Sequence, residues 1–222
     1  MPVRALRQRN PHRTRDAILD AAAELFAGRG YNATSLADVG ARAGVSRGTP
    51  GYCFGNKAAL YRAVIERAVE DVRRAVHSGR VRARASGRTP EEILAGVVGE
   101  YFDYLHSHPV FVQLIERAAL GGEALPDELR LAVRAGQEAV AAIADELGLD
   151  VAPGGEASQL LLSIISLCWF PVIHGLTVAP AVGVPLASAA ALERRRQHII
   201  TLVLHGFRGL SAAAATDPAR GN

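Results

Sequence analysis

Cysteine is scarce in this chain of 222 residues, and its only two copies, Cys53 and Cys168, lie far apart in the sequence. They form no CxxC pair or other metal-ligand spacing, and a disulfide framework would need more cysteines than this. We therefore expect no metal site and no cofactor, and we expect the reducing environment of the cytoplasm. No apolar stretch follows the basic N-terminus, so we also expect no secretory signal peptide.

The sequence also lacks the signatures of the common enzyme classes. It contains no P-loop, no dinucleotide-binding fingerprint, no metal-binding helix and no Ser-His-Asp signature. His106 and His108 are two residues apart, which is poor spacing for two ligands of one metal on a helix, and we interpret them as a helix end. These absences favour a protein that is not an enzyme, and a helical enzyme remains as an alternative.

Positive charge is concentrated at one end of the chain. Residues 1–60 contain nine Arg and Lys residues against four Asp and Glu residues, whereas the net charge of the whole chain is only +3. A basic region confined to one end is typical of a nucleic-acid-binding module. A solvated arginine-rich tail would give the same distribution.

Helical periodicity runs through the chain, and no convincing alternation of apolar and polar residues indicates a strand. We therefore predict an all-α fold. The first helix ends at the glycines Gly28 and Gly30. The expected helices lie within residues 14–31, 35–43, from 46 onward, 56–76, 90–106, 109–120, 127–148, 156–178 and 187–210, and residues 77–90 are expected to form a connection.

Two of these helices are short and are joined by a tight turn. Ser35, with Asp38 three residues later, has the arrangement of a capping box, which starts the helix over residues 35–43. Gly44 suits a left-handed turn residue because it has no Cβ atom. The stretch therefore predicts a helix-turn-helix.

The second helix of this pair is expected to begin at Ser46, with the serine side chain as its cap. Arg47 and Thr49 would then project from its first turn. In a helix-turn-helix, this end of the second helix meets base edges in the major groove of DNA.

The run from Thr14 to Tyr61 resembles the N-terminal domain of the TetR family of tetracycline-repressor-like transcriptional regulators. The matching pieces are AILDAAAELFAGRGYNATSLADVGARAGVS and YCFGNKAALYRAV, with the helix-turn-helix in the usual place. The resemblance implies a homodimeric regulator, most often a repressor, which binds a palindromic double-stranded DNA operator and is released by a small-molecule effector. A DNA-binding or architectural protein that responds to no effector remains open, because only the resemblance implies an effector domain.

The sequence departs from the family at Pro50–Gly51, where Leu-Tyr is usual and the tyrosine commonly binds a backbone phosphate. Proline is tolerated in the first turn of a helix, and a glycine lets the backbone approach DNA closely. We expect Tyr52 to replace the missing tyrosine, and Lys57, the only lysine, lies at a phosphate-contacting position of the family. The predicted DNA-contacting residues are Thr34, Ser35, Ser46, Arg47, Gly48, Thr49, Gly51, Tyr52 and Lys57.

We expect three parts along the chain. An arginine-rich arm and the helix-turn-helix domain occupy residues 1–55, a linking helix and connection occupy 56–88, and a helical effector-binding and dimerisation domain occupies 89–222. The expected effector-binding residues are Tyr101, Tyr104, Phe111, Trp169, Phe170 and His174, each of which would fit a simple core as well. The predicted dimer interface is an apolar stripe formed by Leu192, Ile199, Val203 and Phe207. Such a stripe would equally fit an intramolecular core.

Residues 157–192 contain no charged side chain. Their stretch 160–179 is about 20 residues long, the length that a membrane span requires. Pro171, His174 and Gly175 interrupt it, however, and clear aromatic or basic belts are missing at its two ends. A buried or interface helix of an all-α protein explains the same run, so we expect no membrane partner.

Overall fold

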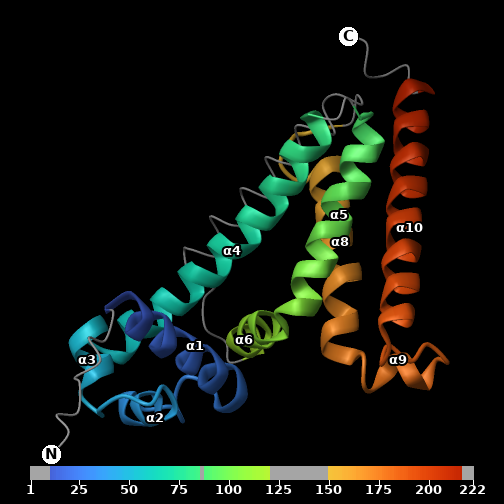
Figure 1. Cartoon of the computed structure of the whole chain (residues 1–222). Helices are drawn as coiled ribbons and strands as arrows, with labels where there is room; N and C mark the ends of the chain where they lie inside the picture. The colour runs from blue at the N-terminus through green and yellow to red at the C-terminus, as the bar shows by residue number, and fades with distance from the viewer. Residues whose placement is uncertain (1–10, 86–87, 121–149, 217–222) are drawn as a thin grey trace, which may run out of the picture. The chain divides into compact units, whose positions relative to one another are not determined.

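The computed structural model describes residues 11–85, 88–120 and 150–216, and the regular elements in these ranges are all helices (Figure 1). The predicted all-α fold is confirmed for this part of the chain. The helix expected over residues 127–148 lies outside the described residues. The helices are α1 (Pro11–Arg29), α2 (Leu36–Arg42), α3 (Thr49–Phe54), α4 (Lys57–Ala85), α5 (Pro90–Ser107), α6 (Pro109–Leu120), α8 (Glu156–His174), α9 (Val178–Ala181) and α10 (Ala189–Thr216).

The chain folds as two compact units. Among the described residues, the first unit contains 11–68 and 113–120, and the second contains 69–85, 88–112 and 150–216. The helices α4 and α6 therefore each contribute one part to the first unit and one part to the second. Each unit has its own apolar core.

The core of the first unit forms where α2 packs against α1 and α3 and where α4 begins. Phe26 lies at its centre, and its ring is in edge contact with Tyr61 at a centroid distance of 5.1 Å. Burying each large apolar side chain contributes about 1.5–3 kcal/mol, before the entropy cost of ordering the chain is counted. α1 buries seven residues, namely Ile18, Leu19, Ala21, Ala22, Leu25, Phe26 and Ala27.

α4 continues through Ala85, so the connection expected over residues 77–90 is wrong up to that residue. Arginine and alanine are abundant in this stretch, and both are good helix formers. A single glycine costs only about 1 kcal/mol inside a helix, so Gly79 does not end α4. Composition alone does not distinguish a polar, basic helix from a loop.

In the second unit, α5 packs against both α8 and α10, and these two helices also pack against each other (Figure 1). The three helices meet along one apolar stripe each, as helices of a bundle do. The most completely buried side chains on these stripes are Leu94, Val98, Phe102, Leu105, Cys168, Ile199 and Phe207.

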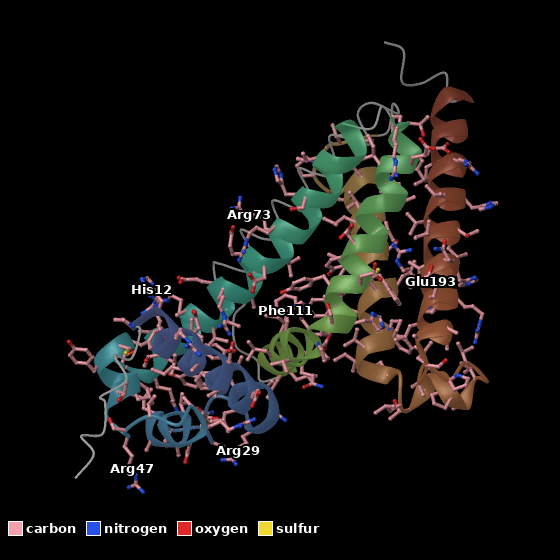
Figure 2. All side chains as sticks on the ribbon, in the orientation of Figure 1. His12, Arg29, Arg47, Arg73, Phe111 and Glu193 are labelled. Atoms are coloured by element: carbon pink, nitrogen blue, oxygen red, sulfur yellow. The ribbon has the colours of Figure 1, made fainter. Side chains whose placement is uncertain are left out.

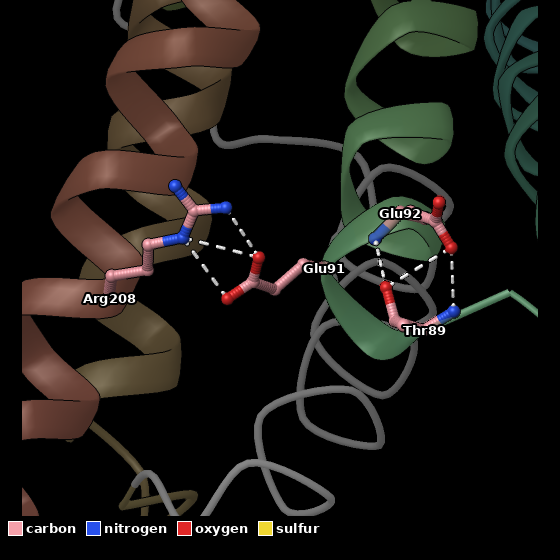
Figure 3. A network of polar contacts seen from close by, with 4 residues as sticks. All are labelled: Thr89, Glu91, Glu92 and Arg208. Atoms are coloured by element: carbon pink, nitrogen blue, oxygen red, sulfur yellow. Dashed lines mark hydrogen bonds and ion pairs between the residues drawn. The ribbon is translucent and has the colours of Figure 1, made fainter.

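The start of α5 is fixed by a capping box. The Thr89 hydroxyl accepts a hydrogen bond from the Glu92 amide at 3.3 Å, and the Glu92 carboxylate accepts one from the Thr89 amide at 2.9 Å (Figure 3). Next to it, Glu91 forms an ion pair with Arg208 of α10, with Oε2 and Nη2 2.6 Å apart. The hydrogen bond to Arg208 lowers the pKa of the Glu91 carboxyl. Capping box and ion pair together place the N-terminal end of α5 beside α10.

Three of the four residues predicted as the dimer interface lie on the inner face of α10, so the prediction is wrong for these three. Ile199, Val203 and Phe207 are at most 4% exposed within the single chain, and Leu192 is partly buried. These side chains face α5 and α8, because α10 buries its apolar stripe within its own chain first. Ile199, Val203 and Phe207 are therefore not available to a second copy.

Candidate nucleic-acid interface

The capping box predicted at the start of α2 is present. The Ser35 hydroxyl oxygen accepts a hydrogen bond from the Asp38 amide at 3.1 Å, and the Asp38 carboxylate accepts one from the Ser35 amide at 3.0 Å. The side-chain and backbone hydrogen bonds from Ser35 lower the pKa of the Asp38 carboxyl. Ser35 remains exposed on the surface, at the N-terminal end of α2. Amides at such an end attract anions, so the predicted phosphate contact of Ser35 is compatible with this position.

The turn of the helix-turn-helix depends on two glycines. Gly44 has φ +66°, the left-handed conformation expected for it after the C-cap Ala43. At Gly40, in α2, a Cβ atom would lie 3.0 Å from the Ser46 carbonyl oxygen and 3.3 Å from the Arg47 Cα. The missing side chain of Gly40 therefore lets α2 approach the turn closely.

α3 begins at Thr49 with Gly48 as its N-cap, so the expected cap at Ser46 is wrong. The Ser46 hydroxyl instead lies 2.7 Å from the Thr49 hydroxyl, and the Ser46 carbonyl accepts the Thr49 amide in a turn. The reason is Pro50: a helix capped by Ser46 would place the proline ring against the carbonyl four residues earlier. Starting at Thr49 moves Pro50 into the first turn, where its missing amide proton has no intrahelical partner to lose.

The two faces of α3 differ in what they present. Pro50 is buried against the domain, whereas the Tyr52 side chain is 92% exposed. Arg47, just before the helix, is exposed too, and Figure 2 shows its side chain extending away from the helices. The nearest atom to a Cβ built on Gly51 is the Leu36 Cδ1 at 3.8 Å, so nothing in the domain requires glycine there. The exposed side of this region thus carries an arginine just before α3 and a tyrosine within it.

A residue that the sequence reasoning missed holds the other end of α3. The guanidinium of Arg15 in α1 lies over the ring of Phe54, with its Cζ 4.2 Å from the ring centroid. It also donates a hydrogen bond to the Cys53 carbonyl at 3.3 Å. A cation at the C-terminal end of a helix is stabilised by the negative end of the helix dipole. In the sequence, Arg15 was only one of many arginines in the basic region, and no local pattern distinguished it.

The loop between α1 and α2 is tied down by Thr34 and Lys57. Thr34 is 2% exposed, and its hydroxyl donates a hydrogen bond to the Gly30 carbonyl at 2.9 Å. The Lys57 ammonium donates to the Tyr31 carbonyl at 3.0 Å and lies 4.4 Å from the centroid of the Tyr31 ring. Both side chains therefore support the helix-turn-helix from inside. Their predicted phosphate contacts stay predictions, and the burial of Thr34 leaves its side chain little access to DNA.

Four of the six residues expected to bind an effector lie together in the second unit. The Trp169 indole N–H donates to the Tyr101 hydroxyl oxygen. Phe111 is in edge contact with both Trp169 and Tyr104, at centroid distances of 5.9 and 6.2 Å. Burial raises the pKa of Tyr101, which keeps its phenol neutral. The cluster is therefore aromatic, uncharged and able to donate a hydrogen bond.

The other two predicted effector residues form a separate pair. Phe170 and His174 have ring centroids 4.5 Å apart, and Phe170 is exposed on the outer side of α8. His106, which was predicted to mark a helix end, lies in the last turn of α5, and its ring stacks on that of Phe102 with the centroids 3.9 Å apart. Burial lowers the pKa of His106, and its Nε2 has no hydrogen-bond partner among the described residues.

Both units match models of one protein family. Residues 18–64 match the model described as bacterial regulatory proteins, tetR family. Residues 90–203 match the tetracyclin repressor-like C-terminal domain. The chain belongs to the tetR family. The resemblance seen in the sequence is thereby confirmed, and this tetR-family chain is a DNA-binding transcriptional regulator.

Individual relatives of this tetR-family chain cover nearly all of it. The HTH-type transcriptional repressor NicS of Pseudomonas putida is 28% identical over 218 residues, which are 91% of this chain and 96% of NicS. The fatty acid degradation regulator FadR of Bacillus halodurans matches with a TM-score of 0.66 at 16% identity, covering 86% of this chain and 98% of FadR. The ketosteroid regulator KstR2 of Mycobacterium tuberculosis matches with a TM-score of 0.63 at 19% identity, covering 86% and 93%. The two structural matches support the fold.

Proposed function

We propose that this chain is a cytoplasmic homodimeric repressor that binds a palindromic operator and leaves it when a small-molecule effector binds the second unit. The observation that carries the proposal is the outer side of α3, where Arg47 and Tyr52 are exposed while Pro50 anchors the helix to its domain. The match to NicS, a transcriptional repressor, favours repression over activation. We propose that the chain is not an enzyme.

Arg47 is the proposed base-reading residue. A guanidinium forms two hydrogen bonds with O6 and N7 of guanine, which is the most common specific contact in the major groove. Thr49, partly exposed two residues further on at the start of α3, is placed to touch a neighbouring base or a thymine methyl group. Gly51 lets the backbone of α3 approach the DNA, and the exposed Tyr52 hydroxyl binds a backbone phosphate.

Ser35 and Lys57 are the proposed phosphate contacts beside α3. Ser35 lies at the exposed start of α2, where free backbone amides favour an anion. The Lys57 ammonium has three donors, and its bonds to the Tyr31 and Asn32 carbonyls leave one for a phosphate. These contacts would set the register of the domain on DNA without reading sequence.

The outer side of α8 and α10 is the proposed dimer interface, in place of the buried stripe. α8 is the one helix among the described residues that is apolar and long enough to cross a membrane, and core helices of soluble proteins meet the same criterion. Only 33% of its most apolar stretch is buried within the chain, and its Leu162 is 60% exposed. Leu202 of α10 is also exposed. A second copy related by a two-fold axis would cover these side chains.

The aromatic cluster of Tyr101, Tyr104, Phe111 and Trp169 is the proposed effector site. Effector sites are mainly apolar with a few polar groups, and this cluster adds a neutral phenol and an indole to apolar rings. An effector releases DNA only if it prefers a conformation whose two α3 helices are wrongly spaced for the operator.

Sequencing of genomic DNA fragments retained by the purified protein tests the proposal. The expected result is a palindrome whose half-sites lie one helical turn, about 34–36 Å, or a multiple of it apart. Titration of small molecules into the protein–operator complex then separates a repressor with an effector from an architectural protein. Retention of DNA with no enriched sequence would contradict operator recognition, and an operator complex that no molecule dissociates would favour the architectural alternative.

A further inference from the structure

The connection between α8 and α10 displays large apolar side chains in a stretch without charge. Leu176 is 88% exposed and Val182 is 69% exposed. Val178 and Val184 are exposed as well, and we call these four residues the connection patch. No charged residue occurs from 157 to 192. Exposed large apolar side chains that cluster within one short segment indicate an interaction site on a soluble protein.

The backbone of the connection is well fixed by hydrogen bonds. The Val182 amide donates to the Val178 carbonyl at 3.1 Å, and the Val184 amide donates to the Ala179 carbonyl at 2.8 Å. Between them, Gly183 adopts φ +78°, which closes the turn after α9. Ala179 is buried, so α9 is anchored while the connection patch points outward. The apolar side chains are therefore carried by a backbone that hydrogen bonds hold in place.

We propose that a second copy of this chain covers the connection patch, so that the dimer interface extends beyond the helices α8 and α10. This inference rests on the homodimer of the proposed function. The patch begins two residues after the end of α8, whose exposed apolar residues include Leu162 and Phe170, and Figure 1 shows the connection leading from α8 through α9 to α10. The charge-free run spans α8 and the connection without a break and ends at Glu193, inside α10.

The composition of the patch identifies the kind of partner. A nucleic acid or an acidic peptide requires cations on the surface that receives it, and the charge-free run offers none. An interface between two copies is self-complementary around a two-fold axis, and the centres of such interfaces are apolar and depleted of charge. The second copy supplies the same apolar surface and needs no complementary charge.

Thiol labelling of a Val182→Cys variant of the full-length protein tests the inference. The rate of maleimide labelling is read at the Val182 peptide by mass spectrometry, in the dimer and in a monomer made by Leu162→Asp. We expect labelling to be at least tenfold slower in the dimer. Val81→Cys in α4 is the matched control, because Val81 is an exposed valine outside the patch, and its labelling rate should not change.

A second measurement uses the patch itself. The double variant Leu176→Asp/Val182→Asp should raise the dissociation constant of the dimer at least tenfold in sedimentation, with an unchanged circular dichroism spectrum, whereas Val81→Asp should not. Equal labelling of Val182→Cys in dimer and monomer would overturn the inference while leaving the homodimer intact. A wild-type protein that sediments as a monomer would overturn both. Protection of Val182→Cys only after neutral phosphatidylcholine vesicles are added would assign the patch to a lipid surface and overturn the inference.

Discussion

Arg15 of α1 lies over the ring of Phe54, the last residue of α3, with the guanidinium carbon 4.2 Å from the ring centroid. A helix as short as α3 is not stable by itself in water, so its position depends on what it packs against. Pro50 anchors its first turn, and Arg15 holds its last. The orientation of the proposed recognition helix is therefore fixed at both ends by its own domain.

Replacing Arg15 by methionine should weaken operator binding more than it weakens the fold. The loss of the cation–π contact should lower the free energy of unfolding by about 0.5–1 kcal/mol, the range for exposed pairs of this kind. Operator affinity should fall further, because α3 loses its fixed end. Arg13→Met, at an exposed position of the same helix, is the control. Chemical denaturation and operator titration on both variants check the prediction, and equal affinities for the two would contradict it.

The capping box of α2 should make stability depend on pH. Hydrogen bonds from Ser35 lower the pKa of Asp38 in the folded state. Its contribution is therefore fully present above the ordinary pKa of the carboxyl and is lost as the pH falls through the folded-state pKa. Ser35→Ala should cost about 0.5–2 kcal/mol of stability at neutral pH and less at about pH 3. Urea denaturation at both pH values measures this, and an equal loss at both would show that Asp38 plays no part.

Two neighbouring residues of α10 should respond differently to a charge. Leu202 is exposed and Val203 is buried. Leu202→Asp should leave the fold intact and dissociate the dimer, and operator binding should weaken with it. Val203→Asp places an unpaired charge in the core and should destabilise the chain by about 3 kcal/mol or more. Sedimentation and thermal denaturation distinguish the two effects. A Leu202→Asp protein that remains dimeric would remove this side of α10 from the interface.

Local sequence patterns determine some features of this fold and leave others open. The helix-turn-helix was predictable because its signals are local: a serine followed by an aspartate three residues later, and a glycine in the turn. The predicted start of α3 was wrong, because the steric requirement of the Pro50 ring outweighs the preference of Ser46 for a capping position. The stripe on α10 was correctly identified as apolar, but periodicity does not say whether a helix face packs within the chain or against a second copy. Long-range contacts such as Arg15 with Phe54 leave no local pattern at all.

Gly51→Leu tests whether Gly51 is needed for a close approach to DNA or whether the Pro50–Gly51 pair is only a poor helix start. Leucine is the better helix former, and a Cβ at this position has no neighbour within the domain closer than 3.8 Å, so the melting temperature should hold or rise. Operator binding should be lost, because the new side chain occupies the space that the DNA backbone needs. Melting temperature and operator affinity are measured on the same variant, with Gly51→Ala as a smaller step. Unchanged or tighter binding by Gly51→Leu would show that close approach is not the reason for the glycine.

The most direct test of the account is the affinity of Arg47→Ala for operator DNA and for unrelated DNA of equal length. If Arg47 reads a base, the loss of specific affinity should be about 1–3 kcal/mol, while weak non-specific binding stays nearly the same. Arg194→Ala, at an exposed position of α10 in the second unit, should change neither affinity. An equal loss on both DNAs, with a shallower salt dependence, would make Arg47 a phosphate contact and contradict the proposal that this residue reads the operator.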